Sequence, residues 1–298
     1  MLIRSASDGN SGKTVVASPP LANQRGPASP CIAINGAAGR MGRQLLMAAA
    51  ENTECQLTTA IEAPNNAAVG SSVALLAAEL SDLTDLMVVA EAREVADSFD
   101  VIVDFTRPEA TLDMLEKLDG SDTSFVIGTT GFTDQQRQTL EEASKRHPIV
   151  FASNYSAGVT LTLNLLATAA ASLGDDYDVE IIEAHHRNKV DAPSGTALSM
   201  GESVAQALGR NLGECAVYGR QGHTGVRDTR TIGFETVRAG DIIGDHTVLF
   251  AGQGERIEIT HRATDRMTFA RGAIRAACWL GDRPAGLYDM HDVLGLRK

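Results

Sequence analysis

Short apolar runs alternate with helical stretches through the first half of the chain, and this alternation is the feature that most restricts its fold. In the helical stretches apolar residues recur on one helix face, as at Met41, Leu45 and Leu46. Strands that alternate with helices build a parallel sheet that helices cover on both faces. The expected strands are residues 31–35, 56–62, 100–105, 124–128 and 149–153.

The pattern changes after Ser156. An apolar helix at 158–173 leads to a strand at 178–184, and a further helix starts at Ser194. Three later runs alternate apolar and polar residues between glycine-rich turns, which predicts an antiparallel or mixed sheet. We therefore expect an α/β unit followed by an α+β unit with a mixed sheet. The three runs are residues 229–241, 245–252 and 255–263.

Residues 1–30 differ in composition from the rest of the chain. They are rich in serine, glycine and asparagine, contain several prolines and have no apolar signal core, so we expect a disordered leader. The apolar stretch 158–173 is interrupted by polar residues such as Thr160 and Asn164. This favours a soluble core helix over a membrane span.

The overall charge limits the partners that the chain can have. A net charge of −12 excludes a general affinity for nucleic acid or for anionic membranes. The cysteines are scattered without metal-ligand spacing, which predicts a reduced, cytoplasmic protein with no structural metal. Any anionic ligand must therefore be attracted by a local group of basic residues. The cysteines are Cys31, Cys55, Cys215 and Cys278.

A glycine-rich turn, "NGAAGRMG", follows the first expected strand and opens a helix. Its glycines at 36, 39 and 42 are a spacing variant of the dinucleotide fingerprint. Bare backbone at Gly36 and Gly39 lets amides approach a pyrophosphate at the positive end of the helix, and Gly42 lets the helix sit close to the sheet. Glu62, which ends the next strand, is placed to bind ribose hydroxyls. The first unit is therefore predicted to be a Rossmann domain.

The residues after Glu62 bear on which nicotinamide cofactor binds. The 2′-phosphate of NADPH needs a basic group near the end of the second strand. Ala63 follows the acid instead, and no Lys or Arg occurs between Arg43 and Arg93. Arg40, in the glycine turn, is the one base within expected reach. We predict NADH as the preferred cofactor, or dual use of NADH and NADPH.

Two further loops, 128–132 and 152–156, follow expected strands. Loops at the carboxyl ends of parallel strands line the ligand crevice, and small hydroxylated residues suit a flat nicotinamide ring. For either loop taken alone, ordinary turn chemistry explains the composition equally well.

The densest group of basic and titratable residues is "EAHHRNKVDAPSGTA", residues 183–197. Histidine gives and takes protons near neutral pH, and lysine supplies a positive charge and a transferable proton. Ser194 is a natural helix N-cap, after which the amides of Gly195 and Thr196 can hold a carboxylate. The stretch predicts a receptor for a small acid with more than one carboxylate. The side chains beside that receptor are His185, His186 and Lys189.

Other interpretations of these residues carry less weight. A lone histidine is more often a core residue, but two histidines and a lysine before a helix start disfavour that interpretation. Metal binding by the pair is disfavoured because no carboxylate or cysteine completes a ligand set. His223 and His246, in the β-rich part, are interpreted as structural or solvated unless they lie near the cleft or an oligomer contact.

Five segments together resemble the bacterial dihydrodipicolinate reductase family. They are "GAAGRMGRQLL", "DFTRPEATL", "VIGTTGF", "IEAHHRNKVDAPSGTAL" and "RAGDIIGDHTVLF". The resemblance covers roughly residues 31–298, and the block from the histidine pair to Ser-Gly-Thr is its most specific part. It implies reduction of 4-hydroxy-tetrahydrodipicolinate to tetrahydrodipicolinate with NADH or NADPH, in diaminopimelate and lysine biosynthesis.

The resemblance also implies an organisation of the chain. Residues 31–156 and 267–298 would form the Rossmann domain. Residues 157–266 would bind the cyclic dicarboxylate and build a homotetramer through their sheet. His185 would be the acid or base, Lys189 the proton donor, and His186, Gly195 and Thr196 substrate contacts. The cofactor would be bound by Gly36, Ala37, Ala38, Gly39, Arg40, Met41, Glu62, Gly128, Thr129, Thr130, Ala152, Ser153, Asn154 and Tyr155.

Two other functions share part of this pattern. A different two-domain nicotinamide reductase, such as a homoserine or amino acid dehydrogenase, would share the glycine turn but would have no reason for the histidine pair. A non-catalytic dinucleotide sensor would bind NADH and would tolerate loss of His185 or Lys189.

Overall fold

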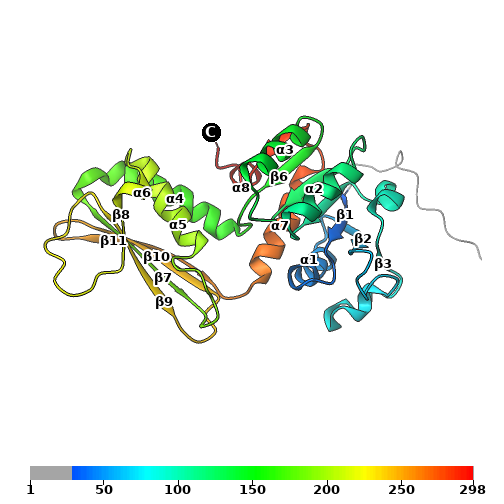
Figure 1. Cartoon of the computed structure of the whole chain (residues 1–298), viewed down its shortest axis with the longest axis horizontal. Helices are drawn as coiled ribbons and strands as arrows, with labels where there is room; N and C mark the ends of the chain where they lie inside the picture. Colours follow the sequence, from blue (N-terminus) through cyan, green and yellow to red (C-terminus); the bar gives the residue numbers. More distant parts are fainter. Residues whose placement is uncertain (1–28, 298) are drawn as a thin grey trace, which may run out of the picture.

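The computed structural model describes residues 29–297, which form two lobes, each around its own sheet (Figure 1). The predicted leader lies outside the described residues except for Ser29 and Pro30. The strands of the first sheet are β1 (Cys31–Asn35), β2 (Gln56–Ile61), β3 (Val88–Val89), β4 (Val101–Asp104), β5 (Ser124–Ile127), β6 (Pro148–Phe151) and β12 (Gly286–Tyr288).

The first sheet is parallel throughout, in the order β12-β6-β5-β4-β1-β2-β3. Its central strands are buried at every position, as the continuous apolar runs predicted. β12, from the end of the chain, pairs with β6 and completes one edge. The chain therefore leaves this lobe after β6 and returns to it near residue 267.

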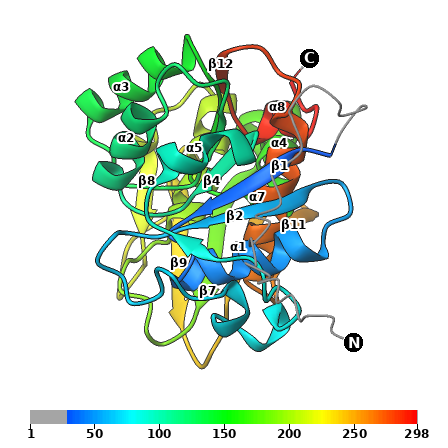
Figure 2. The same ribbon diagram turned by 90° about the vertical axis from the view of Figure 1, so that its right-hand side faces the viewer.

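Helices cover both faces of this sheet (Figure 2). On one face, Ile32 and Ile34 pack with Leu45 and Ile274 from two helices that are distant in sequence. On the other, Ile102 and Phe125 belong to a separate cluster. The helices of this lobe are α1 (Arg40–Glu51), α2 (Pro108–Lys117), α3 (Asp134–Ser144), α7 (Met267–Leu280) and α8 (Met290–Val293), with short 3-10 turns η2 (Val73–Leu75), η3 (Ala78–Leu80) and η4 (Ala92–Ser98).

The second lobe is a five-stranded mixed sheet with helices on one face only (Figure 1). Its strands are β7 (Asp178–His185), β8 (Ala216–Tyr218), β9 (Ile232–Arg238), β10 (Gly244–Ala251) and β11 (Arg256–Ala263), in the order β11-β10-β7-β9-β8. β7 runs parallel to β9 and antiparallel to β10. The helices are α4 (Ala157–Leu173), α5 (Gly195–Ala207) and α6 (Leu212–Cys215), with a 3-10 turn η5 (Gly174–Asp176).

α4 continues into η5 as one helix, Ala157–Asp176, that is long and apolar enough to cross a membrane by length and composition alone. Leu166 and Ala170 face the core that the second sheet shares with α5, whereas Leu161 and Leu165 are exposed. Helices of this length and composition also occur in the cores of proteins that cross no membrane, so this helix is weak evidence for a membrane span.

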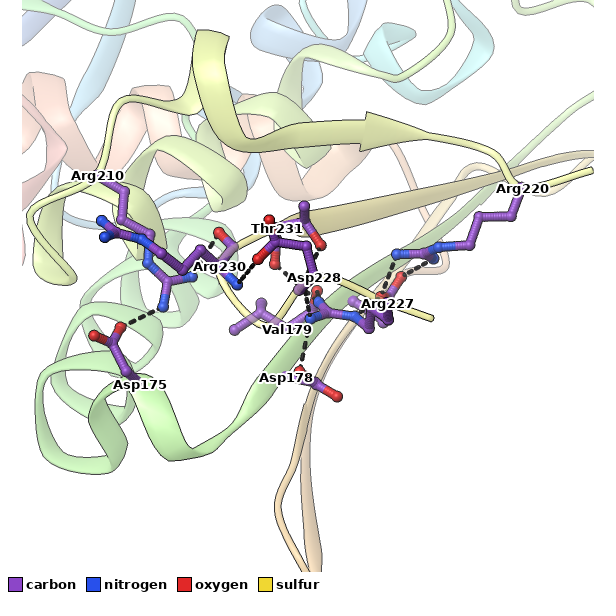
Figure 3. Close-up of polar contacts among 10 residues, drawn as sticks. Asp175, Asp178, Val179, Arg210, Arg220, Arg227, Asp228, Arg230 and Thr231 are labelled. Atoms are coloured by element: carbon purple, nitrogen blue, oxygen red, sulfur yellow. Dashed lines mark hydrogen bonds and ion pairs between the residues drawn. The ribbon is translucent and has the colours of Figure 1, made fainter. Parts of the chain in front are cut away.

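Arginines fix the long segment between β8 and β9 to the sheet (Figure 3). Arg220 makes two hydrogen bonds of 2.8 Å to the Glu180 carboxylate. Arg227 donates to Glu180 and Asp178 and to backbone carbonyls, including that of Val179. These guanidinium groups are occupied by carboxylates of the chain itself, so the segment is a structural clamp and not a vacant anion site.

Candidate active site

The glycine turn after β1 is closed by contacts that admit no side chain. Gly36 has φ of +72°, a conformation that favours glycine. A Cβ on Gly42 would lie 2.0 Å from the carbonyl oxygen of Gly36, so α1 can approach the turn only because Gly42 has none. α1 begins at Arg40, with Gly39 as N-cap and no side-chain cap. This cradle fits a pyrophosphate at the helix N-terminus.

A cavity of about 1010 Å³ opens beside the glycine turn. Glu62 lines it at the end of β2, buried to 9% exposure. Of the predicted cofactor residues, Gly36, Gly39, Arg40, Met41 and Glu62 line this cavity. Ala37 and Ala38 belong to the same turn, but Ala37 is fully buried and donates its amide to Ile61.

Arg40 is not the one base near this cavity, contrary to the sequence argument. Arg107, the N-cap residue of α2, and Lys117, in its last turn, also line it. Lys117 lies 2.9 Å from Asp113. Parallel order places the start of α2 next to the glycine turn because β4 is adjacent to β1. Local spacing in the sequence could not show that neighbourhood.

The predicted cofactor residues of the two loops, 128–132 and 152–156, fall into two groups: some line a cavity and the others hold the loops in place. Thr130, Ala152, Ser153 and Asn154 line a second cavity. The other three predicted residues, Gly128, Thr129 and Tyr155, support the loops from behind. A Cβ on Gly128 would lie 2.2 Å from the Phe105 ring, Thr129 bonds to Thr111 at 3.0 Å, and the buried Tyr155 hydroxyl donates to backbone carbonyls of Val150 and Ile127.

The second cavity, of about 560 Å³, lies between the lobes and gathers much of the basic stretch. His185, at the end of β7, and Lys189 line it together with Ser194, Gly195 and Thr196. Lys189 Nζ lies 2.8 Å from Asp191 Oδ1. The loops of the dinucleotide lobe that carry Thr130 and Asn154 form the facing wall. A proton-carrying group and a helix N-terminus therefore share one cavity.

The N-terminus of α5 is built as the sequence predicted. Ser194 is its N-cap, and Ser194 Oγ accepts a hydrogen bond from the Ala197 amide at 3.2 Å. The amides of Gly195 and Thr196 therefore face the cavity end of the helix, where an anion is stabilised. Asn154 Nδ2 donates to Thr196 Oγ1 at 3.3 Å, which ties the interlobe segment to this helix start.

A buried carboxylate stands behind His185. Glu183 is 1% exposed and is in hydrogen-bond contact with Nδ1 of His185. Arg238 donates to both oxygens of Glu183, at 3.0 and 2.8 Å. Burial opposes ionisation of Glu183, but the hydrogen bonds from Arg238 and His185 outweigh it and hold its pKa below the usual range.

Both buried histidines of this region favour the neutral form. Burial lowers the pKa of His185 from its ordinary value, although Glu183 acts in the opposite direction. Burial, with His185 nearby, lowers the pKa of His246 to about 4. His246 is 3% exposed, its Nε2 lies 3.0 Å from Ser194 Oγ, and its ring packs edge-on against His185. His246 thus belongs to the site, where the sequence left it undecided.

Glu183, His185 and His246 also form the one group among the described residues that could hold a metal ion, with ligand atoms within 4.8 Å of one another. The sequence argument against a metal relied on the lack of a nearby carboxylate, and that premise was wrong. Both oxygens of Glu183, however, are engaged by the Arg238 cation. The arrangement is therefore a hydrogen-bonded network in which a cation already neutralises the acid.

His186 lies outside the cavity that its neighbour His185 lines. It does not line either of these cavities, and its Nε2 lies 3.3 Å from Nη2 of Arg266, the residue before α7. The contact joins the end of β7 to the segment by which the chain returns to the first lobe. In this arrangement His186 contacts the connection between the lobes.

The cavity wall contains residues that the sequence did not single out. Asp289, Met290 and His291, at α8, line it from the dinucleotide lobe. No local signal could have placed them there, because α8 reaches the cavity only through the return of the chain. Glu183 did carry a signal, since it occupies an inward position of an alternating strand, between Ile181 and His185. The remaining lining residues are Phe151, Val159, Thr160, Leu163 and Ser199.

A glycine cradle on a parallel sheet, next to a cavity with a histidine, a lysine and a helix N-terminus, defines a two-domain oxidoreductase that uses a pyridine nucleotide. Comparison with known proteins is more specific. The family described as "Dihydrodipicolinate reductase, N-terminus" matches residues 31–155, and "Dihydrodipicolinate reductase, C-terminus" matches residues 158–294. The chain belongs to the dihydrodipicolinate reductase family.

Individual relatives agree with this assignment. A 4-hydroxy-tetrahydrodipicolinate reductase from Hahella chejuensis (strain KCTC 2396) is 57% identical over 271 residues, which cover 89% of this chain and 99% of the relative. The structure of a dipicolinate-bound dihydrodipicolinate reductase from Paenisporosarcina sp. TG-14 matches with a TM-score of 0.67 at 25% identity, over 87% of this chain and 97% of that one. The resemblance inferred from the sequence is confirmed.

A more distant solved structure shares the fold alone. An amine dehydrogenase from Mycobacterium smegmatis matches with a TM-score of 0.54 at 11% identity, over 87% of this chain and 94% of that one. Such a likeness carries no information on the substrate of this chain.

Proposed function

We propose that this protein reduces 4-hydroxy-tetrahydrodipicolinate to tetrahydrodipicolinate with a pyridine nucleotide, in diaminopimelate and lysine biosynthesis. The family and the 57% identical relative support the reaction. The structural observation that supports it most is the interlobe cavity, which brings His185, Lys189 and the start of α5 against the dinucleotide loops. A cyclic dicarboxylate suits this cavity because positive charge and helix amides converge on it.

The residues divide the chemical work as follows. One substrate carboxylate is held by the amides of Gly195 and Thr196, while Lys189 attracts the anion. When bound in the glycine cradle, the cofactor supplies a hydride. Lys189 and His185 lie on the side where negative charge develops on the substrate ring and where the ring is protonated. Their interaction with the ring strengthens as this charge grows. Closure of the lobes brings the cofactor to the ligand, and His186, which follows His185 in the substrate lobe, is a further substrate contact.

The preferred cofactor is NADH, with NADPH as a second substrate. Glu62 offers a carboxylate at the ribose position and Ala63 beside it offers no charge. Arg40, Arg107 and Lys117 line the same cavity, so a 2′-phosphate meets some positive charge there. Lys117 is already paired with Asp113 in the same cavity, so Arg107 is the base that adds to Arg40 in support of dual use. Thr130, Ala152, Ser153 and Asn154 extend the proposed cofactor contacts into the interlobe cavity, and Gly128, Thr129 and Tyr155 position the loops that carry them.

The second lobe also builds the assembly, which we propose to be a cytoplasmic homotetramer. Only one face of its sheet is covered by helices, and the outer face exposes Ile182 and Val237 to 43% and 45%. Apolar strand positions that face solvent are a typical interface between subunits. We propose the domain limits 31–156 with 267–298 for the dinucleotide domain, and 157–266 for the substrate and assembly domain.

The decisive test is a spectrophotometric assay with freshly prepared 4-hydroxy-tetrahydrodipicolinate and either NADH or NADPH. We expect oxidation of both cofactors with a higher kcat/KM for NADH. Homoserine-pathway and amino acid dehydrogenase substrates serve as controls, and turnover of those alone would contradict the proposal.

The Lys189→Ala variant tests the site itself. Its kcat should fall at least a hundredfold, because a positioned proton donor contributes about 10²- to 10⁴-fold. The NADH dissociation constant should stay within twofold, since Lys189 lies outside the dinucleotide cavity. Full turnover in this variant would instead favour a different catalytic site.

A further inference from the structure

Glu183 has no role in the reaction as described so far, although it is a carboxylate of only 1% exposure in direct contact with His185. It lies on β7 two residues before His185, on the same inward face of the strand. Burying a carboxylate costs free energy unless charged and hydrogen-bonding partners surround it. The partners that this chain supplies therefore show what the carboxylate is built to do.

Every partner of Glu183 is a donor. Arg238 Nη1 and Nη2 donate to its two oxygens, and the Ser194 amide donates to Oε1 at 3.1 Å. Thr236 Oγ1 reaches the same oxygen at 3.3 Å. The remaining contact is Nδ1 of His185. Because an ionised carboxylate only accepts hydrogen bonds, Nδ1 must carry the proton on the side that faces Glu183.

We propose that Glu183, held by Arg238, is a positioning residue that fixes the His185 ring with its proton on Nδ1 and with Nε2 directed to the cavity as an acceptor. A second feature keeps Nε2 uncovered, namely the lack of a side chain on the adjacent Gly244. A Cβ on this residue would lie 3.1 Å from Nε2. The inference deepens the proposed function and rests on it for the identity of the reaction.

This assignment separates the roles of the two candidate proton donors. Loss of water from the 4-hydroxy substrate comes first: the hydroxyl leaves its ring carbon, the neighbouring carbon loses a proton, and the new double bond is conjugated with the imine. Hydride addition to the far carbon of this imine–alkene unit then moves an electron pair onto the ring nitrogen. The imine re-forms when the carbon between takes a proton. Neutral His185 has no proton on Nε2 to give, so the N–H bond that breaks is that of the Lys189 ammonium, which becomes a neutral amine. His185 Nε2 accepts a hydrogen bond and orients the substrate.

The same residues could instead be a metal site, and the two possibilities differ in what they predict. A metal would take the lone pairs of Glu183 that the network uses and would displace the proton from Nδ1 of His185. The network requires no ion, since Arg238 supplies the compensating charge. Dialysis of the wild-type enzyme against EDTA should therefore leave kcat unchanged. Loss of activity on dialysis that Zn²⁺ alone restores would overturn the proposal.

The direct test is the tautomer of His185. In two-bond ¹H–¹⁵N spectra of ¹⁵N-histidine-labelled wild-type protein, assigned with His185→Gln, we expect the Nδ1–H form at pH 7.5. In Glu183→Gln the signal should move toward the Nε2–H form, because the amide can donate to Nδ1. An Nε2–H form in the wild type would overturn the proposal, even if Glu183→Gln fails to fold.

Kinetics separate positioning from a merely structural role. In Glu183→Gln we expect kcat to fall at least thirtyfold, with the NADH dissociation constant within twofold of wild type. Glu183→Asp should retain more activity than Glu183→Gln because it keeps the charge. Glu180→Gln is the matched control, since Glu180 lies on the same strand and also holds two arginines, away from the cavity. Its kcat should equal that of the wild type.

Equal losses in Glu180→Gln and Glu183→Gln would assign a structural role and overturn the proposal. Failure of the proposed function is distinguishable: a wild type inactive on 4-hydroxy-tetrahydrodipicolinate would refute the reaction, whereas the spectra would still report the tautomer.

Discussion

Gly42 shows how one absent methyl group sets the geometry of the cofactor site. The carbonyl of Gly36 occupies the space that a Cβ would need, at 2.0 Å, and backbone cannot yield as a side chain does. The close approach of α1 to β1 therefore depends on glycine at this position.

We expect Gly42→Ala to weaken both folding and cofactor binding. Forcing a methyl group into packed backbone costs about 1–3 kcal/mol, which should appear as a lower free energy of unfolding in urea. The NADH dissociation constant, measured by fluorescence titration, should rise at least tenfold. Gly281→Ala is the control, because its nearest neighbour lies at 3.5 Å, and it should change neither quantity. Wild-type affinity in Gly42→Ala would refute the cradle.

His246 makes stability depend on pH in a defined direction. Its pKa is about 4 in the folded protein, whereas the ordinary value, which applies to the unfolded chain, is 6.5. Between these values the unfolded chain binds more protons, so the free energy of unfolding falls as pH falls from 6.5 to 4, by about 3 kcal/mol at most. His246→Gln should flatten this part of the urea-unfolding profile. The exposed His223 provides the control: His223→Gln should keep the wild-type slope.

The candidate site was only partly predictable from single residues. His185, Lys189 and the Ser194 cap were visible because they lie within one short segment. Arg107 and His291 were not, because they reach their cavities through strand order and chain return. Sequence spacing reports neighbours along the chain, whereas a cavity between lobes is made of neighbours in space.

At the scale of elements, predictability follows length and burial. β1, β4 and β5 were predicted within two residues, since a fully covered strand is apolar at every position. β3, β8 and β12 were missed because two or three residues show no period. The mixed character of the second sheet was predicted, but its order was not, because β7 pairs with β9 and β10 although two helices and a further strand intervene in the chain.

The start of α5 couples a helix cap to the active site. Ser194 Oγ caps the helix and contacts His246, and Ser194 also donates its amide to Glu183. We expect Ser194→Ala to lower the free energy of unfolding by about 1–2 kcal/mol, from the lost cap and the unpaired imidazole. The KM for the dicarboxylate should rise while the NADH dissociation constant stays constant.

Ser172→Ala serves as its control, because Ser172 is exposed on α4. It should match the wild type in urea unfolding and in KM. If Ser194→Ala also matches the wild type in KM, the start of α5 does not hold the substrate.

At the scale of the whole molecule, the uncovered face of the second sheet is the feature that a single chain leaves unexplained. Ile182 lies near the middle of this face, on the central strand β7. Ile182→Lys should convert the proposed tetramer to smaller species in light scattering, because an ammonium cannot be buried there without a partner. Dinucleotide binding should persist, since it resides in the other lobe.

Leu75→Lys is the matched control, since Leu75 is 78% exposed on the dinucleotide lobe. It should leave the assembly unchanged. A wild-type protein that is monomeric at micromolar concentration, or an unchanged tetramer in Ile182→Lys, would refute assembly through this face.

Because the end of the chain returns to the first lobe, the core of that lobe is completed only late in synthesis. α7 supplies Ile274 and Ala277 to the core over β1 and β4, and β12 closes the edge beside β6. A nascent chain halted after β11 would expose the apolar side of the dinucleotide sheet and would lack the wall formed by α8. The half that is translated first is thus the half whose core is completed last.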